Sequence, residues 1–445
     1  MQIKLSSHFT YKTLLRFTLP SIAMMIFTSI YSVVDGFFVS NFAGKTAFAA
    51  VNIIFPFLMI VSTVGFMFGA GGSALVAKTM GEGDSERANK YFSLFVYVTM
   101  AIGVILALLG IIFIEPIAIL MGADAEILPH AVLYGRVILC ALPLFVLQLL
   151  FQSFFITAEK PRLGLAVILA CGFTNMVLDA VLVTLFPSEL KLLGAALATA
   201  ISQIVGGLVP LIYFSRKNSS ILRLCKTNFD AKALLKACTN GASEFMSNVS
   251  MSVVAILYNL QLIKYAGENG VAAYGVMMYV SMIFAATFFG YTMGSAPVIS
   301  FHYGAQNTDE LKGLFRRSMV ITAAFSGAMF VLSQVLAQFL SQIFVGYDAE
   351  LMAMTVHGFR IFSFCFLLMG FAIFGSGFFT ALNDGLTSAL ISFLRTLVFQ
   401  VIAILVFPEI WQLDGIWISI VAAEGFAVLA TAFFLAVKRK KYHYA

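Results

Sequence analysis

The sequence predicts an all-α polytopic membrane protein with twelve transmembrane helices arranged as two six-helix repeats. Of its 445 residues, 61% are hydrophobic and only 11% are charged, and the mean hydropathy is +0.97. Apolar runs of about 20 residues or more, each long enough to cross a bilayer, recur along the whole chain. The second half of the sequence also repeats motifs of the first half at a nearly constant offset. Together these features indicate a transporter-like helical bundle.

The expected spans are separated by short polar loops. They cover residues 14–39, 47–77, 91–115, 130–157, 163–187, 192–215, 238–263, 270–299, 315–345, 353–381, 386–408 and 413–437. If the N-terminus is inside, the inner segments hold 21 of the 27 Lys and Arg residues and the outer loops hold three. This asymmetry follows the positive-inside rule and places both termini in the cytoplasm. The net charge of +6 therefore indicates topology and contact with anionic lipid, and no nucleic-acid partner is expected.

The repeat is visible in the letters of the sequence. The segment FAGKTAFAAVN (42–52) aligns without gaps with YAGENGVAAYG (265–275), and the same offset pairs Gly81 with Gly304. Because each repeat holds an even number of helices, both halves keep the same orientation in the membrane, which is typical of transporters with a substrate site between the halves. We expect an N-lobe (1–215), a basic cytoplasmic linker (216–236) and a C-lobe (237–445).

Two carboxylates inside predicted spans are not copied in the second repeat. Asp35, in the stretch YSVVDGFFVS, aligns with Tyr258, and Asp179 aligns with Ile402. A charge inside lipid is costly, so such a residue is a functional candidate. Because structural residues should recur in both lobes, we expect Asp35 and Asp179 to serve something that only the N-lobe does.

The two carboxylates are expected at the same depth. Asp35 lies about 28 Å along its helix from Arg16, and Asp179 lies about 25 Å along its helix from Arg162, at ~1.5 Å per residue. Asn175 precedes Asp179 by four residues and shares its helix face.

The following helix runs in the opposite direction and brings Thr199 to a comparable depth. A polar cavity in the N-lobe is therefore expected to be ringed by Asp35, Asn175, Asp179 and Thr199. Two carboxylates in a low-dielectric pocket cannot both ionise cheaply, which suits the uptake and release of a proton. The same oxygens could instead bind Na⁺ at Asp35 and Asp179. In the alternative structural interpretation, the two carboxylates only anchor helices to one another.

Other intramembrane residues are open to two interpretations. Glu244, near the start of the seventh span, either neutralises a cationic substrate or anchors its helix. Glu424, in the last span, has either a functional role or a role in helix packing. Phe37, Phe154 and Phe155 are candidates to line a pocket for flat cations. Their alternative roles are contact with lipid and packing in the core.

The sequence does not favour an enzyme. It contains no HExxH, paired CxxC, P-loop or GxSxG motif, and its five histidines are dispersed. No soluble segment is long enough to form a nucleotide-binding domain. The expected energy source is thus an ion gradient, and no cofactor or structural metal is expected.

Several motifs together resemble the multidrug and toxic compound extrusion (MATE) family, over essentially the whole chain. They are VDGFFVSNFAG, TAEKPR, TNMVLD, GAALATAISQ and GSAPVISFHYGAQN, in this order. The sequence looks most similar to the bacterial MepA-type and DinF-type exporters. The resemblance implies two bundles around a V-shaped central cleft in the bacterial cytoplasmic membrane, and antiport of organic cations against H⁺ or Na⁺. By position it assigns the coupling role to Asp35, Asn175, Asp179 and Thr199.

The sequence also departs from the family pattern. Ala296 stands before Pro297, where the family often has a polar residue, and the tenth span lacks the carboxylate found in the branch with a cation site in its C-lobe. These departures favour an N-lobe site and H⁺ rather than Na⁺. We expect a monomer that exports lipophilic cationic drugs or metabolites. The alternatives are a lipid-linked precursor flippase of the same superfamily, which would need a cleft rich in Arg and Lys, and an uncoupled channel.

Overall fold

The computed structural model describes residues 3–346 and 348–445, with all side chains except those of Phe37, Ser40, Asn41, Lys45 and Glu189. Every regular element in these ranges is a helix. The first half contains α1 (Tyr11–Phe38), α2 (Lys45–Gly81), α3 (Ser85–Leu120), α4 (Leu128–Thr157), α5 (Pro161–Leu178) and α6 (Lys191–Ser215). The second half contains α7 (Ala231–Asn240), α8 (Ala242–Gly304), α9 (Thr308–Val345), α10 (Ala349–Phe362), α11 (Phe366–Ala381), α12 (Gly385–Phe393) and α13 (Phe399–Tyr442).

The predicted twelve spans are confirmed in this part of the chain. Two of the long helices contain one residue with a non-helical backbone, Gly267 in α8 (φ 59°, ψ −148°) and Gln412 in α13 (φ 52°, ψ −125°), and each divides its helix into two spans. Short 3₁₀ and π segments join α10 to α11 and α12 to α13, so each pair forms one span. Each lobe therefore holds six spans.

The repeat also specifies local geometry. Asp84 caps α3 by accepting a hydrogen bond from the N–H three residues later (2.9 Å), and Asn307, its equivalent in the second repeat, caps α9 in the same way (3.1 Å). The preceding residues, Gly83 (φ 88°) and Gln306 (φ 54°), both adopt the left-handed backbone conformation. Equivalent sequence positions thus form equivalent turns in the two lobes.

The linker differs from the expected basic loop, because its last residues are helical. Asp230 caps α7 by accepting a hydrogen bond from the N–H of Ala233 (3.0 Å), and Ala233 and Ala237 form the buried face of this helix. The next span begins at Ala242, later than the predicted residue 238. The division into lobes at residues 215 and 237 stays a prediction.

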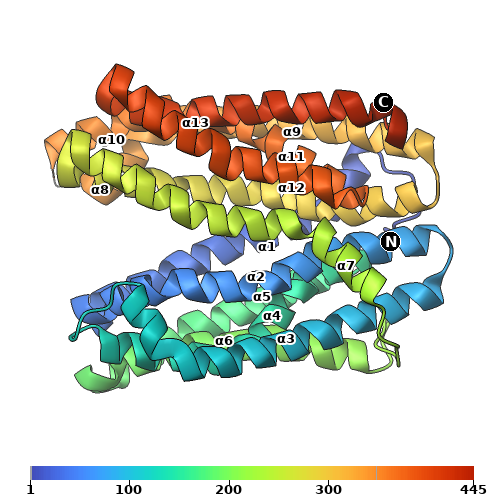
Figure 1. Cartoon of the computed structure of the whole chain (residues 1–445), viewed down its shortest axis with the longest axis horizontal. Helices are drawn as coiled ribbons and strands as arrows, with labels where there is room; N and C mark the ends of the chain where they lie inside the picture. Colours follow the sequence, from blue (N-terminus) through green and yellow to red (C-terminus); the bar gives the residue numbers. More distant parts are fainter. Residues whose placement is uncertain (1–2, 347) are drawn as a thin grey trace.

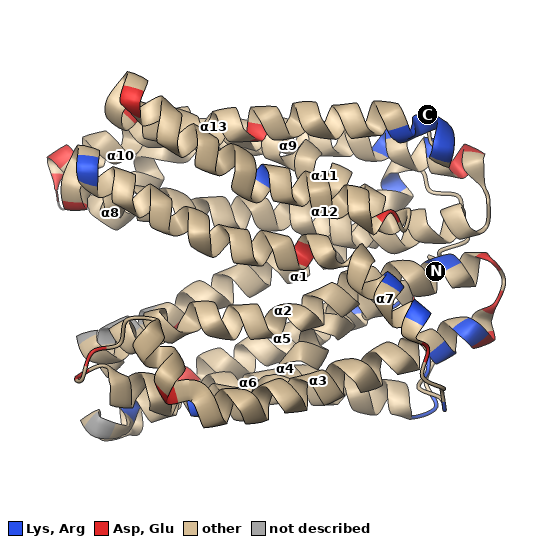
Figure 2. Cartoon of the chain, in the orientation of Figure 1, with Lys and Arg blue, Asp and Glu red and all other residues tan. Residues whose placement is uncertain are grey.

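The two bundles lie side by side, and both chain termini are at the same end of the molecule (Figure 1). Most Lys and Arg residues gather there (Figure 2), so we call it the basic end. The bundles approach each other at the basic end and diverge toward the opposite end, as the V-shaped architecture predicts. One apolar cluster joins the lobes, with Phe17 and Ile22 on one side and Tyr291 and Val298 on the other.

The lobes meet through a reciprocal backbone contact between α2 and α8. A Cβ atom on Gly81 would overlap the carbonyl oxygen of Phe301, and a Cβ atom on Gly304 would overlap the carbonyl oxygen of Lys78. The two glycines occupy equivalent positions in the repeat, and so do the two carbonyl residues. Small residues allow helix backbones to approach closely inside membranes, and here they close the basic end symmetrically.

The N-terminal segment before α1 adds a polar connection between the lobes. The backbone N–H of Leu5 donates to Glu159 of the N-lobe (2.7 Å), and the N–H of Phe9 donates to Glu310 of the C-lobe (2.9 Å). The side chains of Leu5 and Phe9 are fully buried in the apolar cluster that joins the lobes.

Replacement of Gly304 by alanine should open the basic end. The added Cβ atom can be accommodated only if α2 and α8 separate, and such overpacking costs about 1–3 kcal/mol. We expect a longer distance between spin labels at Glu82 and Lys312, two exposed positions on opposite lobes, measured by pulsed electron paramagnetic resonance. Gly327→Ala is the control, because a Cβ atom there meets nothing within 4 Å. An unchanged distance in Gly304→Ala would contradict this account of closure.

Candidate ion-coupling site

Three helices of the N-lobe bring the predicted polar residues together. Thr199 of α6 donates a hydrogen bond from Oγ1 to Oδ1 of Asp35 on α1 (3.1 Å). Asn175 of α5 donates from Nδ2 to the same carboxylate oxygen (3.3 Å) and lies 3.4 Å from Oγ1 of Thr199. The depth argument thus predicted this cluster correctly, although its function stays a prediction.

Asp179 completes the cluster in an unusual way. Its side chain is fully buried, and neither carboxyl oxygen finds a hydrogen-bond donor among the described residues. The carboxyl of Asp35 is close enough to interact with it. Two carboxyls can share such a place at low cost only when a proton lies between them, because two bare charges would repel each other without water to screen them.

Irregular backbone lies beside both carboxylates. Asp179 is the first residue of the π-helical segment Asp179–Val183, and Asp35 lies four residues before the π-helical segment Val39–Ala43. The N–H of Val39 bonds to the carbonyls of both Asp35 and Gly36. Such π segments occur frequently at functional sites, where they change the direction in which side chains point.

Sequence reasoning missed the aromatic and amide groups around the cluster. Tyr134 of α4 is buried and interacts with Thr199, and Tyr31 of α1 interacts with Gln148 of α4. Gln148 is itself buried inside a membrane span, and a buried amide there is a signal that could have been used. Tyr31 and Tyr134 could not be singled out from the sequence, because tyrosines are common in such helices.

The aromatic candidates for the substrate pocket are placed elsewhere. Phe154 and Phe155 are fully buried and pack in an aromatic cluster with Phe92 and Phe214, with ring centroids 4.9–5.3 Å apart. This packing argues against direct contact of Phe154 or Phe155 with a substrate and favours the core role. The side chain of Phe37 lies outside the described part of the structure.

Glu244 lies in the first turn of α8, where its N–H bonds to the carbonyl of Gly241 (3.1 Å). Within the described ranges, no cation pairs with its half-buried carboxylate. It therefore does not anchor its helix through an ion pair. A role in contact with a cationic substrate stays a prediction.

The C-lobe holds a buried ion pair in place of a carboxylate pair. Arg395 donates from Nε to both carboxylate oxygens of Glu424 (3.1 and 2.9 Å), and their side chains are only 14% and 5% exposed. Tyr258, which aligns with Asp35, donates to Gln400 (2.8 Å). Glu424 thus has a structural partner, which favours the packing interpretation, and a functional role of this residue stays a prediction. In the described part of the C-lobe, the pair Asp35–Asp179 has no counterpart.

A metal centre is not indicated by the geometry. No group of three His, Cys, Asp or Glu side chains that could hold a metal ion occurs among the described residues. However, Oδ1 of Asn175 and both carboxyl oxygens of Asp179 are buried without donors in this part of the chain. These oxygens could bind a proton or a weakly held Na⁺.

Two lobes of six spans each, with a buried acidic cluster in one of them, define a membrane transporter of the two-repeat type. The model of the MatE family matches this chain twice, over residues 20–181 and 245–406, so the chain belongs to the MatE family. The two matches also confirm the internal repeat. Members of this family are transporters rather than enzymes.

Curated relatives and solved structures agree with this assignment. The chain is 24% identical over 419 residues to the multidrug export protein MepA of Staphylococcus haemolyticus, covering 93% of this chain and 90% of that protein. It is 25% identical to MepA of Staphylococcus saprophyticus, covering 94% and 92%. A multidrug resistance MATE transporter solved in an outward-facing conformation superposes with a TM-score of 0.91 at 23% identity, covering 98% of this chain and 97% of that one.

Replacement of Asp179 by asparagine should leave the fold stable. The carboxyl has no donor to lose among the described residues, and the new amide can donate to Asp35 without a proton. We expect the midpoint of thermal unfolding in detergent to stay within a few degrees of the wild-type value, or to rise. A large decrease would support the structural interpretation, in which Asp179 is a helix anchor.

The matched change at Glu424 should have the opposite effect on stability. Glu424→Gln removes the carboxylate that pairs with Arg395 and leaves a buried cation uncompensated. Breaking a buried pair in this way costs about 3–5 kcal/mol. The same thermal unfolding experiment should show a clear decrease in the midpoint. A midpoint equal to that of the wild type would mean that Arg395 finds another partner or reaches water.

Proposed function

We propose that this protein exports lipophilic organic cations across a bacterial cytoplasmic membrane in exchange for H⁺. The observation that carries the proposal is the buried Asp179 carboxyl, which lacks a donor among the described residues and interacts with Asp35. Such a pair changes its charge when one proton binds or leaves. The names of the relatives, which are multidrug export proteins, support the substrate class.

The proton and the substrate compete for the same negative charge in this mechanism. When the pair has lost its proton, the N-lobe attracts a cation. When a proton enters from the divergent end, the charge disappears and the cation is released there. Asn175 and Thr199 hold Asp35 in place through their hydrogen bonds, so they are positioning residues in this proposal.

Na⁺ is the alternative coupling ion. The free Oδ1 atom of Asn175 and the two oxygens of Asp179, four residues apart in the sequence, are three candidate oxygen ligands. Thr199, however, donates its hydroxyl proton to Asp35, and a full oxygen cage would need more ligands than these. The arrangement therefore favours H⁺.

The flippase alternative receives less support from the C-lobe. A carrier of an anionic pyrophosphate needs free cations facing its substrate. Beyond the first few residues of each predicted span, the spans contain three arginines, Arg136, Arg360 and Arg395, and Arg395 is already neutralised by Glu424. We further propose that the basic end faces the cytoplasm and that the protein acts as a monomer.

Efflux of a fluorescent lipophilic cation from proteoliposomes tests the proposal. An imposed pH gradient should drive efflux by the wild type, and an imposed Na⁺ gradient alone should not, because one proton changes the charge of the pair. Asp35→Asn should abolish the driven efflux, since its amide carries no titratable charge. Asp309→Asn, an exposed carboxylate outside the site, is the control and should retain efflux.

Each other outcome has a definite meaning. Efflux driven only by Na⁺ would replace H⁺ by Na⁺ at the same residues. Full efflux by Asp35→Asn would remove this residue from the coupling site. If neither gradient moves the dye, the cation-export proposal fails, and transport of lipid-linked substrates becomes the next activity to measure.

A further inference from the structure

The linker between the lobes forms a hydrogen-bonded loop against α3. Asn89 accepts a hydrogen bond from the N–H of Arg223 (2.7 Å), and Ser93 accepts one from the N–H of Cys225 (2.9 Å). Leu222 is fully buried in the apolar core of the N-lobe. This segment of the linker therefore has a defined place, beside the first turns of α3.

That place is the boundary between water and lipid. The apolar part of α3 begins near residue 91, and the linker reaches Cys225 beside Ser93 and Tyr97, whose ring is 48% exposed. Exposed tyrosines are typical of the headgroup region of a membrane. The loop thus holds its cations at the level of lipid phosphates, at the basic end of the molecule.

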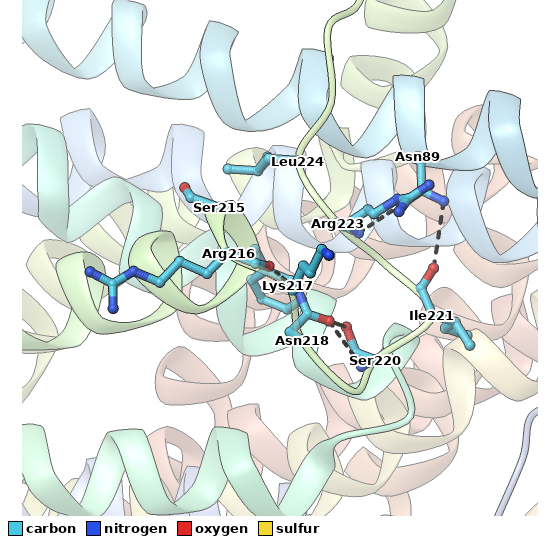
Figure 3. Close-up of a pocket in the computed structure, with 10 residues that line it drawn as sticks. Asn89, Ser215, Arg216, Lys217, Asn218, Ser220, Ile221, Arg223 and Leu224 are labelled. Atoms are coloured by element: carbon cyan, nitrogen blue, oxygen red, sulfur yellow. Dashed lines mark hydrogen bonds between the residues drawn. The ribbon is translucent and has the colours of Figure 1, made fainter.

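A cavity of about 560 Å³ lies between this loop and the end of α6. Lys217, Asn218, Ser220 and Arg223 line it, and Arg223 lies next to Asn89 (Figure 3). The side chain of Arg216 extends outward from the same loop (Figure 3). The cavity is therefore built from cations and hydrogen-bonding groups, with no acidic residue among those that line it.

The cationic groups of this cavity have no protein counter-ion in the described structure. Among the described residues, no carboxylate lies within ion-pair distance of Arg216, Lys217 or Arg223. The amide of Asn218 is occupied by Ser220 (2.7 and 2.9 Å), so the loop satisfies its own polar groups. The three cations are left to bind an external anion.

Exposed apolar side chains on the same linker point to a lipid as the source of that anion. Ile221 lines the cavity and is 42% exposed, and Phe229, farther along the linker, lies beside Lys226 and Lys90 and is 77% exposed. A free anion in water gives no reason to expose an aromatic ring there. Apolar anchors combined with clustered Lys and Arg are instead typical of segments that lie in the interface of anionic membranes.

We propose that the linker is a binding site for the phosphate headgroup of an anionic phospholipid. Lys217 and Arg223 bind the phosphate, Arg216 adds positive charge next to the cavity, and Ile221 and Phe229 contact the acyl boundary from the same linker. Because the linker joins the two lobes and α7 packs on α2, a bound lipid fixes the linker at the basic end of the molecule. The site is separate from the ion-coupling cluster and does not depend on the proposed transport function.

Lipid binding to the purified full-length protein in detergent tests the proposal. The ligands are phosphatidylglycerol, phosphatidylcholine and inorganic phosphate, and the readout is the shift in the thermal unfolding midpoint as each is titrated, since a ligand of the native state raises this midpoint. We expect a saturable increase with phosphatidylglycerol. At low salt, the triple variant Arg216→Gln, Lys217→Gln, Arg223→Gln should bind it roughly 100-fold more weakly.

A matched control keeps the change in net charge equal. The triple variant Arg439→Gln, Lys440→Gln, Lys441→Gln removes three cations from the C-terminus at the same basic end and should keep most of the affinity. If the linker variant folds poorly, Phe229→Ser provides a second test, because this exposed ring makes little packing contact. Its affinity should fall roughly tenfold with no loss of positive charge.

Three results would overturn the proposal. The two triple variants could lose affinity equally, which would mean a diffuse charge effect. Phosphatidylcholine could bind as tightly as phosphatidylglycerol, which would exclude recognition of the negative headgroup. Inorganic phosphate could bind as tightly as the lipid, with Phe229→Ser unchanged, which would identify a site for a free anion.

Discussion

The absence of water inside the bilayer is the constraint on which this structure depends. Each backbone N–H and C=O group in the hydrocarbon must be bonded within its own segment, so the spans are helices. The same constraint acts on side chains. A carboxylate in the interior must find donors, a cation or a proton. The described residues illustrate these situations. Asp35 has hydrogen-bond donors and Glu424 has the cation Arg395, whereas Asp179 has neither a donor nor a cation among the described residues and is left with a proton as its means of neutralisation.

The repeat separates what the fold needs from what the function needs. Features shared by the lobes, such as the caps at Asp84 and Asn307 and the facing glycines Gly81 and Gly304, form turns and the contact between lobes. At the position of Asp35, the C-lobe has Tyr258, a neutral group bonded to Gln400. At this position the N-lobe thus has an ionisable group and the C-lobe has a neutral one, which makes the pair of lobes chemically asymmetric.

Much of this could be predicted from the sequence because the signals are local. The length of the apolar runs indicated the spans, the constant offset between matching motifs indicated the repeat, and the rise per residue placed Asp35 and Asp179 at a common depth. The prediction was less successful where partners come from distant segments. Arg395 and Glu424 lie on different helices, and each taken alone gave no sign of the other.

The aromatic residues illustrate the same limit. Phe154 and Phe155 were candidates for a substrate pocket because a phenylalanine in a span can face lipid, core or cavity. Their place in the core follows from Phe92 and Phe214, which come from α3 and α6 and meet only in three dimensions. The helix α7 was missed because its apolar face, Ala233, Leu234, Ala237 and Cys238, is short and overlaps the end of a basic segment.

Helix α1 links the acidic cluster to the contact between the lobes. Asp35 lies in its last turn, whereas Ser21 and Ile22 pack directly against Gly290 of α8, so that a Cβ atom on Gly290 would overlap their backbone. Pro20 stands immediately before this contact and removes one backbone hydrogen bond from the helix, which makes it a point where α1 can bend. If Asp35 changes its charge as proposed, the resulting force acts on a helix that is held against α8 at Ser21 and Ile22 and is weakened next to this contact. Because π segments lie next to Asp35 and Asp179, the helical hydrogen bonding is irregular beside the two carboxyl groups that are proposed to change their charge. In the proposed mechanism, helix α1 alone would thus connect the protonation of Asp35 to the lobe interface, without a chain of side-chain contacts between them.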